Sequence, residues 1–346
     1  MGEKSAGFKS IDLAKFIFAF FVVGIHVRPF EPYSALANYI FRNVVSGLAV
    51  PFFFMASCYF FFRKLEFENG RIKKSAENFS RLKKYFLRIL TLYVLWSGVY
   101  LVWLIPQWII TDSFSFKMFL SFFKAFLVKW SYYHLWYILC LLYVIPVMYF
   151  LLRHINIKTF TVIMAVIYVL GVLYYTYGKL FTPEILIRLI NFVPIPVGSY
   201  LLIMPSVTTC LYVDKCKLNK NMALLLFAVC YVLFAAESLF FYYNADRSWF
   251  VQYSFMIIPT VYFLFVWVKS CNLNISDNTA SMLRNMSSAV YFVHPMVLNL
   301  FGLIIAKEDA ERITYFFIIS LLSALVAFVL CKVKDKTNSK ILSLFM

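Results

Sequence analysis

Residues 11–30 read IDLAKFIFAFFVVGIHVRPF, an apolar stretch interrupted by Asp12, Lys15 and His26 before it ends near Arg28. A run of about 18 or more apolar residues is long enough to cross the hydrocarbon core of a bilayer. Ionisable side chains in such a run cost about 2.5 kcal/mol or more each near the centre, and they normally face a protein interior, a cavity or a partner. The stretch therefore predicts a transmembrane helix whose ionisable side chains have a function.

The three polar residues share one face of this predicted helix. At 100° per residue, Lys15 and His26 both fall within about 60° of Asp12. Lys15 and His26 are separated by roughly 16 Å along the axis, so they lie toward opposite sides of the membrane. The alternative is that Lys15 extends to the inner headgroups and pairs with Asp12, while His26 sits at the outer interface. The shared face favours a common role.

The composition places the whole chain in the membrane. Its 346 residues are 63% hydrophobic, 21% aromatic and only 14% charged. We predict an all-α bundle with one transmembrane domain over residues 1–346, in which the first apolar run is retained rather than cleaved. Ten spans are expected, near 11–28, 44–62, 86–105, 134–152, 159–176, 195–212, 222–243, 250–268, 287–306 and 313–331.

The net charge of +17 follows from topology and does not indicate a nucleic-acid partner. Most Lys and Arg residues fall at the N-terminus and in alternate loops, whereas acidic residues divide almost evenly between the two sets of loops. The positive-inside rule then predicts that both termini are cytoplasmic. The basic loop 63–85 also lies on that side, where it serves topology and lipid contact or docks an anionic cofactor.

Two more ionisable groups lie inside predicted spans. Glu237 either pairs with His26 and orients its imidazole, or bonds a neighbouring helix. His294, in the pattern Tyr291-x-x-His294-Pro295, is either a substrate contact or a hydrogen-bonded link between helices. The seven cysteines show no disulfide framework, and no metal-ligand spacing is present.

Five segments carry a further pattern. The first is Asp12-x-x-Lys15, then ten residues, then His26. The others are VPFFFMASCYFF (50–61), YFLRILTLYVLW (85–96), HLWYILCLLY (134–143) and SSAVYFVHPMVL (287–298). Together they resemble the acyltransferase-3 family of membrane proteins, in which Arg is usual at the Lys15 position, Gly at Cys58 and a further Arg at Tyr85, where Lys84 adjoins. The first and third segments most resemble the membrane half of vancomycin-resistance serine/alanine racemases, a branch associated with outward movement of serine.

The resemblance implies an enzyme of the bacterial cytoplasmic membrane that moves an acyl group from cytoplasmic acetyl-CoA to a hydroxyl of a cell-surface or lipid-linked glycan. A neutral imidazole suits removal of the hydroxyl proton, so His26 is the expected general base. Glu237 is its expected partner. Coenzyme A is expected to bind with its phosphates at Lys84 and Arg88 and its pantetheine arm along the stripe from Lys15 to His26, and substrate contacts are expected at Asp12, Tyr291 and His294. No metal is expected.

Other functions remain open from the sequence. A transporter or flippase for a small polar solute such as serine also needs buried charge, and interrupted helices near Pro194 and Pro196 would suit one. A purely structural scaffold is poorly supported, because charge in lipid is costly without a use. Residues 113–130 predict an amphipathic helix on the outer surface, as an interfacial anchor or as a border of the acceptor site.

Overall fold

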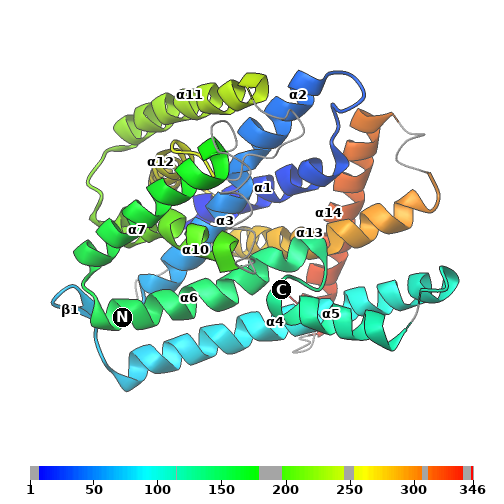
Figure 1. Cartoon of the computed structure of the whole chain (residues 1–346), viewed down its shortest axis with the longest axis horizontal. Helices are drawn as coiled ribbons and strands as arrows, with labels where there is room; N and C mark the ends of the chain where they lie inside the picture. The colour runs from blue at the N-terminus through cyan, green and yellow to red at the C-terminus, as the bar shows by residue number, and fades with distance from the viewer. Residues whose placement is uncertain are drawn as a thin grey trace. The chain divides into compact units, whose positions relative to one another are not determined.

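The computed structural model describes residues 8–113, 115–178, 197–244, 253–305, 311–337 and 344–345 (Figure 1). Nearly all of its regular structure is helical. The α-helices are α1 (Lys9–Val27), α2 (Ala35–Tyr39), α3 (Ala49–Phe62), α4 (Ala76–Ile110), α5 (Phe116–Val128), α6 (Trp136–His154), α7 (Ile157–Val172), α10 (Val197–Thr208), α11 (Lys220–Asn244), α12 (Ile257–Ser270), α13 (Asp277–Gly302) and α14 (Arg312–Thr337). Short π-helical or 3₁₀ segments occupy Ile40–Val45, Ser46–Leu48, Tyr133–Leu135, Leu173–Tyr177 and Thr209–Lys215.

The chain divides into two compact units, each built from separate stretches of sequence. The first unit comprises Met1–Arg63, Val166–Pro183 and Ser206–Ser339, and the second comprises Lys64–Ala165, Glu184–Pro205 and Lys340–Met346. Helices α7 and α10 each pass from one unit into the other. The two units are described separately below.

Six helical segments among the described residues are long and apolar enough to cross a membrane. They are Lys9–Val27, Ala35–Phe62, Ala76–Ile110, Phe116–His154, Lys220–Asn244 and Arg312–Thr337. The segments Ile157–Val172 and Ile257–Ser270 are apolar but shorter, and α13 covers most of the ninth predicted span. A multi-pass helical membrane protein is thus confirmed, whereas the count of ten spans and the side of each terminus stay predictions.

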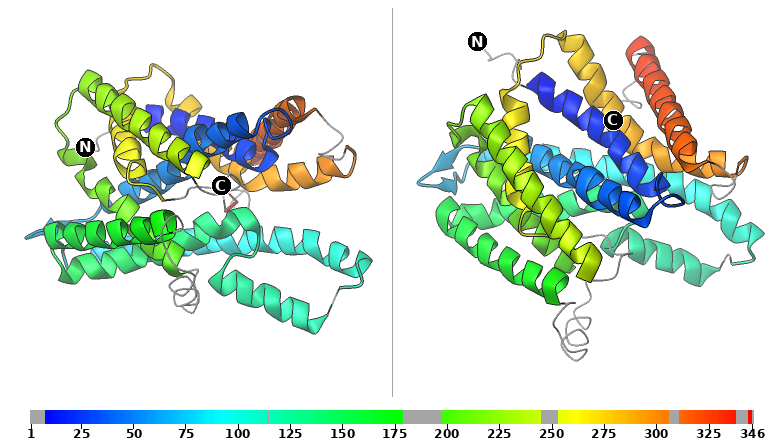
Figure 2. Two further views of the ribbon diagram at one scale, coloured as in Figure 1. Left: turned by 45° about the horizontal axis from the view of Figure 1, so that its top comes forward. Right: turned by 90° about the horizontal axis from the view of Figure 1, so that it is seen from above.

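Helix α1 lies at the centre of the first unit, where it packs against α3, α12, α13 and α14 (Figure 2). The phenylalanine run of α3 supplies much of this packing. The Phe52 ring lies 4.9 Å from the Phe18 ring of α1 and 5.4 Å from the Phe265 ring of α12, measured between centroids. Because protein surrounds α1 on several sides, its polar residues can be held away from lipid.

The helical segment that leads into α3 begins with α2 at Ala35, before residue 44, where the second span was predicted to start. Ser34 caps α2 by accepting a hydrogen bond from the backbone N–H of Ala37, and the helical path then continues through a π-helical turn. Gly24 of α1 accommodates this turn, since a Cβ at Gly24 would lie only 2.6 Å from the ring of Phe41. The close approach needs a residue without a side chain.

Helices α4 and α6 pack side by side in the second unit (Figure 1). Helix α4 begins ten residues before the predicted third span, because Ser75 caps it and the basic residues that follow lie on its first turns. Tyrosine hydroxyls donate to the last carbonyl groups of α5, from Tyr93 to Phe126 at 2.6 Å and from Tyr143 to Leu127 at 2.6 Å. These bonds satisfy carbonyls that a helix end leaves without partners.

His134 is buried in the second unit. The imidazole packs edge-on against Tyr100, Tyr132 and Tyr133, with ring centroids 4.9–5.8 Å apart. The three tyrosines thus enclose the histidine.

A β-hairpin occupies part of the predicted loop 63–85. Strand β1 (Phe67–Glu68) pairs antiparallel with β2 (Arg71–Ile72). Between them, Asn69 and Gly70 have φ values of 50° and 73°, which is the conformation that Asn-Gly favours in a two-residue hairpin turn.

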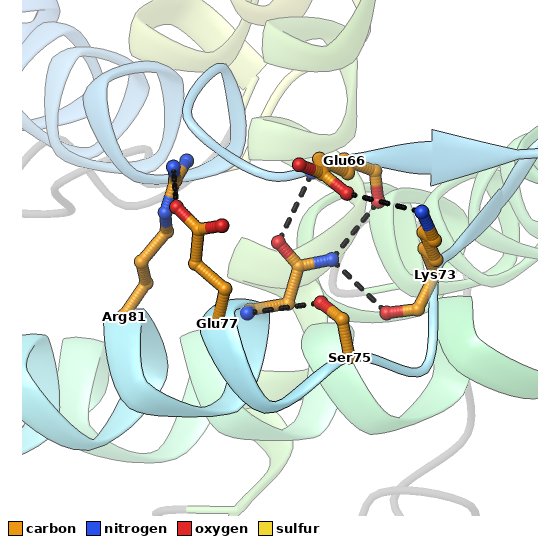
Figure 3. A network of polar contacts seen from close by, with 6 residues as sticks. Glu66, Lys73, Ser75, Glu77 and Arg81 are labelled. Carbon is orange, nitrogen blue, oxygen red and sulfur yellow. Dashed lines mark hydrogen bonds and ion pairs between the residues drawn. The ribbon is translucent and has the colours of Figure 1, made fainter.

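Asn78, on the first turn of α4, ties this hairpin to the helix. Figure 3 shows Glu66 and Lys73, its two backbone partners, beside Ser75 at the start of the helix. Its fully buried side chain accepts a hydrogen bond from the backbone N–H of Glu66 at 3.1 Å. It donates to the carbonyl groups of Glu66 and Lys73, both at 3.0 Å. The side-chain amide can form about four hydrogen bonds. Three of them are made to the backbone of this loop.

We expect Asn78→Ala to loosen this loop. The substitution leaves the backbone N–H of Glu66 without this acceptor and removes one of the two hydrogen bonds to each of the Glu66 and Lys73 carbonyls, at a cost of about 0.5–1.5 kcal/mol for each lost bond. Trypsin should then cut faster at the basic residues of 64–74. The control is Glu77→Ala, which removes only an exposed ion pair with Arg81. Equal cleavage of both variants would contradict the role given to Asn78.

Candidate functional site between helices α1 and α13

Helices α1 and α13 run parallel and pack against each other along their length (Figure 2). Three contacts follow in the same order along both helices: Lys9 with Asp277, Asp12 with Arg284, and His26 with His294. The first contact is an exposed ion pair, while the other two involve buried groups. The predicted polar face of α1 is thus directed in large part toward α13.

Asp12 forms a forked ion pair with Arg284. The Nε atom of Arg284 donates to Oδ1 at 3.0 Å, and its Nη2 atom donates to Oδ2 at 2.7 Å. The Asp12 side chain is only 2% exposed, whereas that of Arg284 is 49% exposed. Two parallel bonds between a planar guanidinium and a carboxylate fix both distance and orientation. This geometry supports a structural role for Asp12 in holding α1 against α13. A contact between Asp12 and substrate stays a prediction.

Arg284 was not identified as a site residue from the sequence, because it was assigned to a loop before the ninth span. Helix α13 begins at Asp277, with the Ser276 hydroxyl accepting from the backbone N–H of Thr279. Arg284 therefore lies two turns inside the helix. The sequence Ser276-Asp277-Asn278-Thr279 is a helix-start signal that could have revealed this.

His26 and His294 lie face to face at the other end of the helix pair. Their ring centroids are 5.4 Å apart and their planes differ by 27°. His294 is fully buried, and its Nδ1 atom lies 3.1 Å from the carbonyl oxygen of Val290. Since a carbonyl can only accept, Nδ1 carries the hydrogen, and in the neutral ring Nε2 carries the lone pair. We call His26 and His294 the histidine pair.

Tyr291 and Lys15 flank this arrangement. Tyr291 is buried one turn before His294, with ring centroids 6.3 Å apart. Lys15 is partly exposed on α1, one turn after Asp12. The first unit thus brings together five of the predicted site residues on two helices, namely Asp12, Lys15, His26, Tyr291 and His294.

Lys84 and Arg88 belong to the second unit. Both are exposed on α4 and lie four residues apart, so they share one face of that helix. Exposed cations at this spacing suit an anionic group of phosphate size. Within the described ranges, no group of three or more His, Cys, Asp or Glu residues gathers as metal ligands.

Glu237 of α11 bonds the turn that leads into α12. Its carboxylate accepts hydrogen bonds from the backbone N–H groups of Phe255 and Met256, at 2.8 and 2.9 Å. It also accepts from the Tyr177 hydroxyl at 3.0 Å. A carboxylate at a helix N-terminus is favoured by the free N–H groups and by the helix dipole. These contacts match the sequence alternative of a carboxyl group bonded to a neighbouring helix, and its pairing with His26 stays a prediction.

We expect Glu237→Gln to keep acyl transfer within a few-fold of the wild-type rate, because its one amide oxygen can still accept from the Phe255 N–H and the Tyr177 hydroxyl, and only the bond from Met256 to the second oxygen is lost. Glu237→Ala should instead lose about 1–2 kcal/mol of unfolding free energy, as other lost helix caps do. Thermal unfolding and initial rates of both variants check this. A Gln variant with unchanged stability but a rate lowered a hundredfold would indicate an acid–base role.

These features define a class: a polytopic helical membrane protein with ionisable groups gathered between two packed helices. The chain belongs to the acyltransferase-3 family, whose model, described as an acyltransferase domain, matches residues 8–332. The resemblance seen in the five sequence segments is thereby confirmed, and the chain is a membrane acyltransferase by family.

Two curated relatives match part of the chain, and both are described as amino-acid racemase from Enterococcus faecalis. One is 26% identical over 169 residues and the other 30% identical over 162 residues. The alignments cover 49% and 46% of this chain but only 22% of each relative. No solved structure matches the chain.

Proposed function

We propose that the protein transfers an acyl group from cytoplasmic acyl-CoA to a hydroxyl of a cell-surface glycan or a related envelope substrate. The acyl group that we propose is acetyl. The observation that carries this proposal is the histidine pair, because it places two imidazoles at one point inside the helical bundle of an acyltransferase-family chain. The expected location is the bacterial cytoplasmic membrane.

His26 acts as the general base in this proposal. It accepts the proton of the acceptor hydroxyl as that oxygen attacks the thioester carbonyl. The carbon–sulfur bond then breaks, and His26 returns the proton to the departing sulfur. The products are the acylated hydroxyl and the free thiol, so atoms and protons balance without a metal.

His294 fixes the geometry around His26. The bond from its Nδ1 to Val290 holds the ring in one orientation and sets its tautomer, as a base needs from its neighbour. Its face supports the His26 ring. The two imidazoles thus work as one unit, in which loss of either member disables the other.

Acyl-CoA supplies the thioester. Lys84 and Arg88 fit its phosphate groups, because they are exposed cations on one helix face, and Lys15 fits a contact along α1. Arg88→Ala should therefore weaken coenzyme A binding.

An exporter of a small polar solute is the second candidate. It is favoured by the two relatives named as amino-acid racemases, which match about half of this chain. A small amino acid such as serine is the solute that this likeness suggests. The buried ion pair of Asp12 and Arg284 would serve a transporter as well as an enzyme.

One experiment separates the two functions. The purified protein in vesicles is given radiolabelled acetyl-CoA with soluble glycan fragments, and serine counterflow is measured in parallel. Acyl transfer without counterflow supports the enzyme. Counterflow without acyl transfer, with the protein shown to be folded, would replace it with the exporter.

A further inference from the structure

One serine of α13 lies on the same face as the groups that meet α1. At 100° per residue, Arg284, Ser287 and His294 fall within about 80° of one another around the helix. The first and the last of these contact α1, through Asp12 and His26 respectively. Ser287 therefore lies on the face of α13 that is directed toward α1, between the forked ion pair and the histidine pair.

The Ser287 side chain is buried, and its hydroxyl forms no hydrogen bond with the residues that the structure describes. A serine inside a helix can donate to the carbonyl group four residues before it. The neighbouring Ser288 does so, to Arg284 at 3.4 Å, whereas Ser287 does not. A buried hydroxyl without a partner lowers the stability of the fold, so its presence in a native structure needs an explanation.

Other buried serines among the described residues lack a hydrogen bond too, including Ser10, Ser320 and Ser323. Ser10 lies about 160° around α1 from Asp12, and the other two belong to α14. Ser287 differs from them by its place, because both of the contacts that flank it join α1 to α13. Its hydroxyl is thus available to a ligand that follows this pair of helices.

The level of Ser287 matches the path proposed for the pantetheine arm of acyl-CoA. The contacts of Arg284 and His294 place Ser287 level with the stretch 15–19 of α1, which ends at the small residue Ala19. Ser287 precedes His294 by seven residues, which corresponds to roughly 10 Å along the helix axis. A donor whose thioester lies at the histidine pair would therefore pass Ser287 with a part of its arm roughly 10 Å from the sulfur.

The pantetheine arm carries an amide group at this distance. From the sulfur, the chain runs through two carbons to the first amide and through two more carbons to the second. The second carbonyl carbon is thus eight bonds from the sulfur, roughly 10 Å in an extended chain that advances about 3.3–3.6 Å for every three bonds. An amide carbonyl buried between helices needs a hydrogen-bond donor, and the Ser287 hydroxyl is one.

We infer that the Ser287 hydroxyl donates a hydrogen bond to the carbonyl oxygen of the second pantetheine amide, counted from the sulfur. The inference rests on the proposed function and assigns a subsite for the acyl donor on α13. The bond forms when the donor binds and is kept as the acyl group moves. It therefore contributes to donor affinity and not to the chemical step.

The test compares two acetyl donors of different length, with the protein in phosphatidylcholine vesicles and soluble glycan fragments as acceptor. Acetyl-CoA carries both amides, whereas S-acetyl-N-acetylcysteamine ends just beyond the first. We expect Ser287→Ala to raise the KM for acetyl-CoA about tenfold with little change in kcat, because a buried carbonyl loses its donor. The KM for the short donor should stay unchanged. Thermal stability without donor should be equal to that of the wild type or higher.

Ser288→Ala is the matched control, because it removes a hydroxyl from the next position, where the bond is to the helix itself. It should keep both KM values. Three results would overturn the inference and leave the acyltransferase intact: an unchanged KM of Ser287→Ala for acetyl-CoA, an equal rise for both donors, or a loss of stability that makes the hydroxyl structural. Absence of transfer from either donor by the wild-type protein would overturn the proposed function itself.

Discussion

Replacement of His26 by Ala is expected to lower kcat/KM for acyl transfer by about 10²–10⁴-fold, the usual contribution of a positioned general base. The His26 ring has a buried neighbour in His294, whose own orientation is set by Val290. The KM for acetyl-CoA should change little, because the phosphate contacts are assigned to other residues.

The control for this prediction is His154→Ala, which removes an exposed histidine at the end of α6. It should leave the rate unchanged. Both variants are compared at equal amounts of folded protein, judged by size-exclusion profile and thermal unfolding. A His26→Ala protein that transfers acetyl groups at the wild-type rate would remove the base from the mechanism.

Arg284→Ala should have the largest effect on stability, a loss of about 3 kcal/mol in unfolding free energy. Removing one partner of a buried ion pair leaves an uncompensated charge, and such losses run from about 3 to 5 kcal/mol. We take the lower end because Arg284 is half exposed, although Asp12 is 2% exposed. Arg284→Lys should recover only part of the loss, since an ammonium group cannot make both bonds.

Two comparisons make this result specific. Lys9→Ala removes an ion pair between the same two helices, but Asp277 is 77% exposed, so the expected loss is below about 1 kcal/mol. The double variant Asp12→Asn with Arg284→Gln removes both charges, and it should be more stable than Arg284→Ala. If Arg284→Ala and Lys9→Ala lose equal stability, the buried pair does not hold α1 to α13.

Hydropathy was sufficient to predict most of the helices in this structure. The first span, predicted at 11–28, is the helix Lys9–Val27, because its apolar run is long and no proline interrupts it before Pro29. Helix starts were less accurate. Helices α4 and α13 begin ten residues before their predicted spans, since polar residues can continue a helix beyond the apolar stretch when Ser75 or Ser276 caps it.

Local signals were present but unused in two places. Asn69-Gly70 predicts a tight hairpin, and the structure contains one there. Ser276 and the residues after it indicate the start of α13, which would have placed Arg284 inside a helix. The predicted interruption near Pro194 and Pro196 lies outside the described residues.

The pairing of α1 with α13 could not be predicted from one sequence. Asp12 and Arg284 are 272 positions apart, and periodicity shows which face of a helix is polar but not which helix it meets. The same holds for Glu237, because its partners Phe255 and Met256 lie in the turn before α12 and meet it only through the packing of α11 against α12. The alignment of Lys15 and His26 on one face predicts a common role for them, which stays a prediction, although four helices pack against α1.

The central claim is that the imidazoles of α1 and α13 act as one catalytic unit. Its most direct test is to measure kcat/KM for acetyl transfer in His26→Ala, in His294→Gln and in the double variant. Residues that act together are strongly non-additive, so the double variant should be within a few-fold of the slower single variant. Losses that simply multiply in the double variant would show that the two histidines work independently, and would contradict the account.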